Sequence, residues 1–185
     1  MSMENLLTNE LSNFEVLYSS EQISKRVKEL GEEITEYYKS IGCNELVCVC
    51  VLQGAMPFFV ELTQNIAIEG VIQDTVRVSS YGNGTTSGKL EFKKGLDVDI
   101  EGKHVLIIED LIETGQSLEF LIQYCQELNP LSVQIVVLLD KYEKHGDAVT
   151  LDYVGFRCED HFVIGYGLDY AMKYRHLPFI GYKTS

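Results

Sequence analysis

The chain alternates short β-rich apolar runs with stretches that carry apolar residues at helical spacing, and this alternation limits the fold more than any other feature. The strand-like runs are LVCVCVL (46–52), TVRVSSY (75–81), HVLIIED (104–110), SVQIVVLLD (132–140) and LDYVGF (151–156). Helical patterns lie at 19–40, from Pro57 onward and at 116–128. Strands that alternate with helices predict an α/β domain with a mainly parallel central sheet.

The first helical pattern carries its own start signal. Ile23, Val27, Leu30 and Ile34 recur at helical spacing, and Ser19 and Gln22 are placed as a capping box. The spacing predicts an amphipathic helix over 19–40.

Length and composition favour one domain spanning 1–185. With 185 residues and 45% hydrophobic content, the chain can bury a substantial core. It has only three prolines, no repeat and no low-complexity linker. We expect residues 1–13 to be frayed and residues 80–92 to form a mobile loop.

The formal net charge of -13 argues against nucleic acid or an anionic membrane as a partner, because either would need clustered Lys and Arg. No signal-peptide pattern or apolar run of about 18 residues is present, so we expect a cytoplasmic protein. The five cysteines include no CxxC pair, which indicates neither a disulfide framework nor a zinc site. Cys48 and Cys50 are predicted to be buried and reduced.

The stretch VLIIEDLIETGQSL (105–118) combines acid with an anion site. Glu109 and Asp110 end an apolar strand, and the following turn offers Gly115, two hydroxyls and a helix N-terminus. Such a turn can bind a phosphate, while paired carboxylates can accept hydrogen bonds from ribose hydroxyls or bind Mg²⁺. The alternative interpretation is that Glu109, Asp110 and Glu113 only stabilise the N-terminus of the following helix through their negative charge.

Other motif matches fail. GNGTTSGK (82–89) lacks Walker A spacing, and DVDIEG (97–102) has Ile108 where a calcium loop needs Glu, so 97–102 is predicted to be a turn. The small polar segment SSYGNGTTSG (79–88) is either a mobile loop or an active-site lid.

Taken together, the chain resembles the purine phosphoribosyltransferases of the hypoxanthine-guanine type from about residue 46 to residue 182. Four segments are similar to that family's motifs: VLIIEDLIETGQSL to the site for phosphoribosyl pyrophosphate (PRPP), VLQGAMPFFVEL to the pyrophosphate loop, SSYGNGTTSG to the lid, and LLDK with DYVGFRCEDHFVIGYGLDYAMKYRHLPFIGY to the purine-binding end. The resemblance implies the type I phosphoribosyltransferase fold with a small hood. It also implies transfer of ribose 5-phosphate from PRPP to N9 of hypoxanthine or guanine, with Mg²⁺ as cofactor.

The resemblance implies roles at the PRPP end of the site. Glu109 and Asp110 would bind the ribose hydroxyls and, together with Asp169, Mg²⁺. The 5-phosphate would be held by Glu113, Thr114, Gly115, Gln116 and Ser117.

Pyrophosphate would be held by Arg175 and by the backbone of Gln53 and Gly54, in a loop where the family has a cis peptide. Ser80 and Tyr81 would close over the site with the lid. We also expect a homo-oligomer, either a dimer or a tetramer.

At the purine, Lys141 would meet the 6-oxygen, Phe162 would stack on the base, the Val163 backbone would read its edge, and Asp169 would lie near the base and metal. Glu113 would be the catalytic base that takes the N7 proton. The alternatives from the residues alone are core packing for Phe162 and solvated surface for Lys141.

Three positions depart from the family. Gln53 replaces lysine, Glu113 replaces aspartate, and His161 replaces lysine. These changes leave two rival functions open: a regulatory module that binds PRPP or a nucleotide without turnover, and a phosphoribosyltransferase for another base. The order of preference among hypoxanthine, guanine and xanthine does not follow from the sequence.

Overall fold

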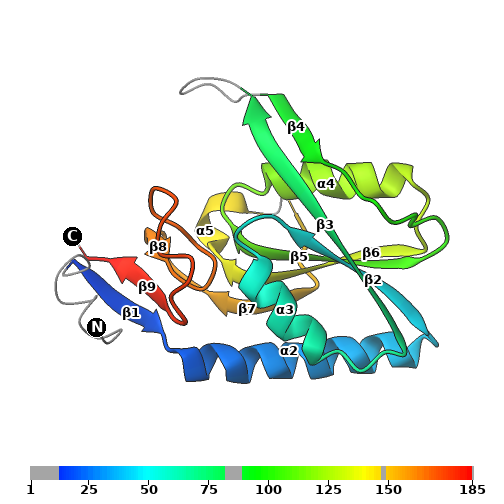
Figure 1. Cartoon of the computed structure of the whole chain (residues 1–185), viewed down its shortest axis with the longest axis horizontal. Coiled ribbons are helices and arrows are strands. Elements are labelled where there is room, and N and C mark those ends of the chain that lie inside the picture. The colour runs from blue at the N-terminus through cyan, green and yellow to red at the C-terminus, as the bar shows by residue number, and fades with distance from the viewer. Residues whose placement is uncertain (1–12, 82–88, 147–148, 185) are drawn as a thin grey trace.

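A computed structural model describes residues 13–81, 89–146 and 149–184 (Figure 1). Its centre is a six-stranded sheet in the order β4-β3-β2-β5-β6-β7. The strands are β2 (Glu45–Val51), β3 (Gly70–Tyr81), β4 (Lys89–Lys94), β5 (His104–Ile112), β6 (Ser132–Asp140) and β7 (Tyr153–Arg157). Every neighbouring pair is parallel except β3 and β4, which confirms the mainly parallel sheet.

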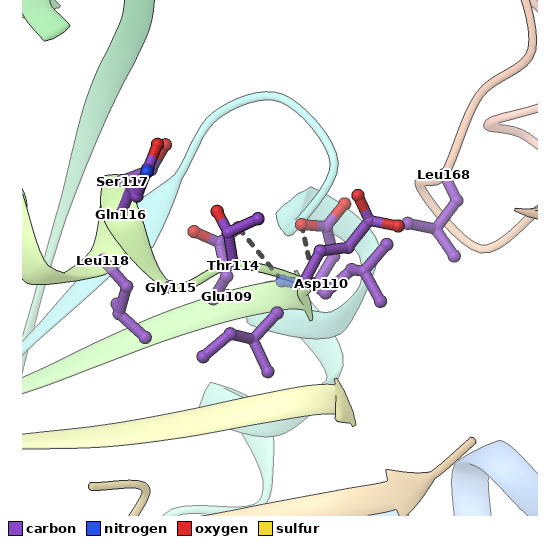
Figure 2. Close-up of a pocket in the computed structure, with 11 residues that line it drawn as sticks. Glu109, Asp110, Thr114, Gly115, Gln116, Ser117, Leu118 and Leu168 are labelled. Carbon is purple, nitrogen blue, oxygen red and sulfur yellow. Dashed lines mark hydrogen bonds between the residues drawn. The ribbon is translucent and has the colours of Figure 1, made fainter. Parts of the chain in front are cut away.

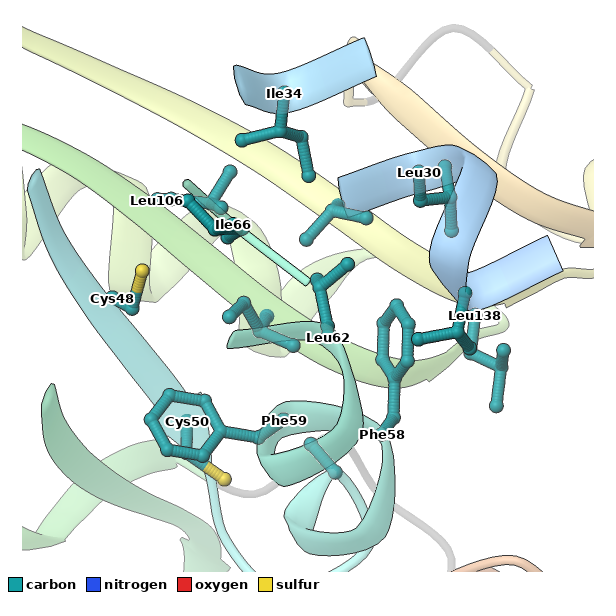
Figure 3. Close-up of a cluster of buried hydrophobic side chains, with 14 of the residues drawn as sticks. Leu30, Ile34, Cys48, Cys50, Phe58, Phe59, Leu62, Ile66, Leu106 and Leu138 are labelled. Atoms are coloured by element: carbon teal, nitrogen blue, oxygen red, sulfur yellow. The ribbon is translucent and has the colours of Figure 1, made fainter. Parts of the chain in front are cut away.

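Helices cover both faces of this sheet, as Figure 1 shows. They are α2 (Ser20–Ser40), α3 (Met56–Gln64), α4 (Gln116–Glu127) and the single turn α5 (Tyr142–His145). The side chains of β2 alternate between the two layers. Cys48 and Cys50 pack with α2 and α3 (Figure 3), whereas Val47 and Val49 share the other layer with α4. A continuous apolar run is therefore buried on both sides, as a central parallel strand requires.

The predicted first helix is confirmed. Ser19 is the N-cap: its hydroxyl accepts the Gln22 N–H at 3.3 Å, and the Gln22 side chain accepts the Ser19 N–H at 2.9 Å. Ile23 and Ile34, at the two ends of the apolar stripe, are fully buried. Burial of a side chain of this size stabilises the fold by about 1.5–3 kcal/mol.

A second, three-stranded antiparallel sheet lies beside the main one and forms the small hood that the resemblance implied (Figure 1). It consists of β1 (Phe14–Tyr18), β9 (Ile180–Lys183) and β8 (Val163–Ile164), in that order. We call this sheet and the loop 165–179 the hood. Residues 1–12, most of the segment expected to be frayed, lie outside the described residues.

The edge strand β7 is covered by the N-terminal segment. Arg26 of α2 donates from Nε to the Gly155 carbonyl at 3.1 Å and from Nη2 to the Val154 carbonyl at 2.9 Å. Tyr18 donates its hydroxyl to the Arg157 carbonyl at 3.1 Å. Three carbonyl groups of the edge strand are thereby bound by side chains.

A buried carboxylate ties the β4–β5 connection to β3. Asp74, whose side chain is 5% exposed, accepts the backbone N–H groups of Thr75, Asp97 and Val98 at 2.6–2.9 Å. Lys94 adds an ion pair at 3.3 Å. The segment 97–102 consists of a bend and a turn, as predicted.

The five cysteines are free and buried, which confirms the prediction for Cys48 and Cys50. Across the part of the chain that the structure describes, no helix combines the length and the apolarity that a membrane crossing demands.

Candidate active site

The stretch 105–118, which holds the Glu109–Asp110 pair and the predicted phosphate-binding turn, lines a cavity of about 290 Å³ at the carboxyl end of β5 (Figure 2). Residues 109–118 form its floor and one wall, and Leu168 of the hood contributes from the other side. The cavity thus lies where ligands collect in parallel α/β sheets.

The strand that carries the carboxylates is longer than predicted. We expected Glu109 and Asp110 to follow the buried strand at its end, but β5 continues to Ile112, with Leu111 opposite Leu139 and Ile112 opposite Asp140. The apolar residues after the acid pair find partners on β6 that local sequence does not reveal. Both carboxylates therefore project from a hydrogen-bonded strand and not from a loop.

The turn after β5 has the geometry of an anion site. Gly115 adopts φ +78°, a left-handed conformation that favours glycine, and is the N-cap of α4. Gly115 provides no side chain to cap the helix, so free N–H groups and the positive end of the helix dipole face the cavity next to Thr114 and Ser117 (Figure 2). An anion bound here needs no lysine.

Among the residues that the structure describes, neither Glu109 nor Asp110 forms an ion pair with a cationic side chain. Glu109 and Asp110 are half-buried, and burial raises the pKa of both side chains; the charge of Asp110 raises that of Glu109 further. A hydrogen bond with Glu109 and hydrogen bonds from the backbone partly offset this by lowering the pKa of Asp110, and the charge of Arg175 lowers it further. A cation or the hydroxyl groups of a sugar would satisfy the pair.

A magnesium ion delivered with a substrate fits this donor set. Within the ranges the structure describes, no group of three or more His, Cys, Asp or Glu side chains is placed to hold a metal by itself. Mg²⁺ is commonly held by one or two carboxylates, with water and substrate phosphate completing its shell. Glu109 and Asp110 match that pattern. Asp169, the third expected ligand, is instead paired with Arg175 at 2.6 Å.

One of the predicted pyrophosphate residues, Gly54, lies against Asp110. The Leu52–Gln53 peptide bond is cis, as the resemblance implied. A Cβ on Gly54 would lie 1.6 Å from the Asp110 Oδ2 atom, and one on Gly167 would lie 1.8 Å from the Gly54 carbonyl oxygen. Three separate segments of the chain are therefore in close contact here, and a side chain at residue 54 or residue 167 would not fit.

Arg175 is placed by the hood loop. Its Nη1 donates to the Gly167 carbonyl at 2.6 Å, and its Nη2 pairs with Asp169 Oδ1 at 2.6 Å. Asp169 Oδ2 also accepts the Met172 N–H at 2.8 Å. The guanidinium group is thus attached to the segment that touches Gly54.

Lys141 is buried, with a side chain 5% exposed, so the solvated-surface interpretation is wrong. Its ammonium group forms a short ion pair with Glu113 and a second pair with Asp160 at 3.3 Å. Its backbone N–H donates to the Ile112 carbonyl at 3.1 Å, which attaches it to the strand of the acid pair. The proposed purine donor and the proposed base are therefore in direct contact.

Phe162 is 47% exposed, so the core-packing interpretation is wrong as well. Its ring meets Tyr170 edge to face, with centroids 5.6 Å apart, and the two line a separate cavity of about 420 Å³. Val163 is buried and begins β8, opposite Tyr182. His161 packs against the same Tyr182 ring at 4.7 Å.

Ser80 and Tyr81 end β3, opposite Leu90 and Lys89 of β4. The prediction of a loop over 80–92 is therefore wrong at both ends, because 80–81 belong to β3 and 89–92 to β4, whose antiparallel pairing local sequence does not reveal. Residues 82–88 lie outside the described residues, so closure of a lid stays a prediction.

The sequence reasoning missed two features of the site. Asp160 contacts Lys141, but a single carboxylate between Glu159 and His161 gives no spacing signal. Gly167 of the hood packs directly against the Gly54 carbonyl group. Its place between Tyr166 and Leu168 in a glycine-rich loop was the one available hint.

Comparisons with known proteins identify the family of the chain. The phosphoribosyl transferase domain family matches residues 15–171. The chain is 44% identical to the hypoxanthine-guanine phosphoribosyltransferase of Bacillus subtilis and 40% identical to the hypoxanthine phosphoribosyltransferase of Escherichia coli K12; each match covers 90% of this chain and over nine-tenths of the relative.

Solved structures show the same likeness. A hypoxanthine phosphoribosyltransferase from Staphylococcus aureus matches with a TM-score of 0.89 and 39% identity, over 99% of this chain and 97% of that one. A hypoxanthine-guanine phosphoribosyltransferase from Bacillus anthracis, with a HEPES molecule in its active site, matches with a TM-score of 0.85 and 39% identity, over 92% and 98%.

One group of relatives is much longer. The chain is 45% identical to the bifunctional protein TilS/HprT of Listeria innocua but spans only 25% of its length. The family match, the identities and the structural likeness all give one assignment. The chain belongs to the phosphoribosyltransferase family, among relatives that are hypoxanthine or hypoxanthine-guanine phosphoribosyltransferases.

Proposed function

We propose that this protein is a purine-salvage enzyme that transfers ribose 5-phosphate from PRPP to N9 of hypoxanthine, guanine or both, giving IMP or GMP and pyrophosphate. One observation carries the proposal. The Glu109–Asp110 carboxylate pair and the anion site at the N-terminus of α4 line a single cavity, so that a sugar and its phosphate can be held side by side.

PRPP is held in three places under this proposal. Its 5-phosphate takes the backbone N–H groups and hydroxyls of 113–117, and its ribose hydroxyls donate to Glu109 and Asp110. Its diphosphate meets Arg175 and the Gln53–Gly54 backbone, where a planar guanidinium suits paired oxygen atoms. The contact of Gly54 with Asp110 supports this proposal, because the residues proposed for the diphosphate and for the ribose are neighbours.

The purine lies between Lys141 and the exposed ring of Phe162, with the Val163 backbone at its edge and Asp169 nearby. As the N9–C1′ bond forms, the bond from C1′ to the diphosphate oxygen breaks and the N7 proton passes to the Glu113 carboxylate. The ion pair between Glu113 and Lys141 supports this assignment, since the proposed proton acceptor and the proposed donor to the 6-oxygen are neighbours.

Mg²⁺ is the proposed cofactor, and when bound it neutralises charge on the diphosphate leaving group. Glu109 and Asp110 would hold it together with substrate oxygen atoms, and Asp169 would contribute if it left Arg175. We further propose a cytoplasmic homo-oligomer, a dimer or a tetramer, which light scattering at several protein concentrations would test.

The test is incubation of the protein with Mg-PRPP and, separately, hypoxanthine, guanine, xanthine, adenine and uracil, with detection of nucleotide and pyrophosphate. We expect turnover with hypoxanthine or guanine. PRPP binding without turnover of any base would identify a regulatory module, and turnover of a different base alone would identify another specificity. The relatives' names do not favour either alternative.

A further inference from the structure

Four charged side chains alternate in sign beside the purine end of the proposed site. Lys141 contacts both Glu113 and Asp160, and Asp160 Oδ1 also pairs with Lys144 at 2.8 Å. The lysine in the middle is 5% exposed, while the two carboxylates are about half exposed. A buried ammonium therefore has two carboxylate partners, and only one of them is a proposed catalytic group.

The second partner matters because the first one changes charge. Under the proposed function, Glu113 becomes neutral when it takes the N7 proton. A buried ammonium whose only counter-charge is removed is strongly destabilised. Lysine has three N–H donors, so it can keep one on Asp160 while others meet Glu113 and an acceptor on the purine.

Asp160 is well placed to remain in position during this step. Its loop follows β7 and is attached to the end of β6 by a hydrogen bond from the Cys158 N–H to the Asp140 carbonyl at 2.9 Å. Lys141 is the next residue after Asp140, so both members of the pair are held by the same strand end. Hydrogen bonds from Lys144 and Lys141 lower the pKa of Asp160 below its ordinary acidic value.

We propose that Asp160 is a positioning residue for the purine step: its carboxylate keeps the Lys141 ammonium paired and in place while Glu113 is engaged by the base. The inference rests on the proposed function and adds to it a residue that does not touch the reacting atoms. Lys144 supports Asp160 from the solvent side, where its own side chain is 37% exposed.

The test compares D160N with E159Q, which removes the neighbouring carboxylate. Glu159 is 76% exposed, and its ion pair is with His161 at 3.5 Å and not with Lys141. For D160N we expect kcat/KM for hypoxanthine to fall about tenfold or more, the size expected for loss of a charge-assisted contact, while the KM for PRPP changes less than about twofold. E159Q should match wild type in both, D160E should recover part of the loss, and K144M should show a smaller loss of the same kind.

Each outcome decides the matter. If the wild-type protein makes nucleotide and D160N has the same kcat/KM for hypoxanthine, the role of Asp160 is overturned and the proposed function stands. If D160N loses kcat/KM equally for hypoxanthine and for PRPP and also has a lowered melting temperature, Asp160 stabilises the fold. That result overturns its positioning role too. A wild-type protein that makes no nucleotide from any base rejects the proposed function itself, and with it this inference.

Discussion

Gly54 and Asp110 are packed so closely that the carboxylate occupies the space a side chain at residue 54 would need. An ideal Cβ on Gly54 would lie 1.6 Å from Asp110 Oδ2 and 2.6 Å from its Cγ. The pyrophosphate loop and the ribose-binding pair of the proposed site therefore cannot change independently.

Gly54→Ala should weaken PRPP binding by about tenfold or more, because the new methyl group displaces the Asp110 carboxylate from its charge-assisted contacts. Isothermal titration with Mg-PRPP measures this. Gly95→Ala is the control, since a Cβ there meets only the movable Tyr124 hydroxyl, at 3.2 Å. Wild-type affinity in Gly54→Ala would show that Asp110 does not contact PRPP.

Glu109→Gln should stabilise the free protein at neutral pH. Burial and the charge of Asp110 raise the folded-state pKa of Glu109 above its unfolded value of about 4.3, so the stability present below that pH is lost as pH rises through the folded-state pKa. Removing the charge should raise the melting temperature by about 2–4 °C, the shift that about 1 kcal/mol produces in a domain of this size.

The comparison is thermal unfolding without ligand at pH 7.5 and near pH 4. The difference in melting temperature between Glu109→Gln and wild type should shrink at the lower pH, where the side chain at position 109 is neutral in both proteins. The exposed Glu101, changed to Gln, is the control. A lower melting temperature for Glu109→Gln at pH 7.5 would contradict the expectation.

Glu113→Gln should lower kcat by about 10²–10⁴, the usual contribution of a positioned general base, while PRPP affinity changes little because backbone N–H groups bind the phosphate. Glu113→Asp, which restores the family's residue, should retain or raise activity. Steady-state kinetics with PRPP binding measured in parallel distinguishes the two effects. If Glu113→Gln turns over purine at the wild-type rate, Glu113 is not the base.

Activity should require a divalent cation, since the chain is acidic and its two site carboxylates cannot neutralise a diphosphate. Nucleotide formation should stop in excess EDTA and return when Mg²⁺ is added beyond the chelator. Full turnover in EDTA would rule out the metal.

Asp74→Asn should lower the free energy of unfolding at pH 7 by about 2 kcal/mol, because charge-assisted hydrogen bonds are lost. Burial alone would raise the pKa of Asp74, but three backbone N–H groups and Lys94 outweigh it and lower the pKa. Its contribution is therefore present above the unfolded-state pKa of about 3.9 and is lost as pH falls through the folded-state value.

Urea unfolding at pH 7 and pH 3 tests this, with Asp97→Asn as the control. Asp97 is 78% exposed and pairs with the same Lys94, at 2.9 Å. Equal stability of Asp74→Asn and wild type at pH 7 would mean that these hydrogen bonds contribute nothing net.

The sequence predicts the central sheet well because each buried strand and helix carries a local signal. The predicted run 132–140 coincides with β6, and α4 ends one residue before its predicted end. Strands β1, β4, β8 and β9 were missed. Their pairing depends on distant segments, as when Phe14 lies opposite Lys183, and strands of two to six residues have too little pattern of their own.

The same division holds within the candidate site. Positions 109–117 could be predicted without the family resemblance, because one continuous stretch carries both the carboxylate pair and the turn. Lys141, Phe162 and Arg175 came only from the resemblance, since nothing local distinguishes them. The contacts of Lys141 with Asp160 and of Gly54 with Gly167 join residues far apart in the chain, and only the folded structure shows them.

The side chains that bind β7 protect this sheet edge from pairing with a strand of another molecule. An unprotected sheet edge offers free carbonyl and N–H groups to a strand from another molecule, which is a route to aggregates. Here a second chain would first have to displace Arg26 from Val154 and Gly155 and Tyr18 from Arg157. One arginine on the first helix thus adds a barrier to strand pairing at this edge, independently of any part it has in stabilising a single molecule.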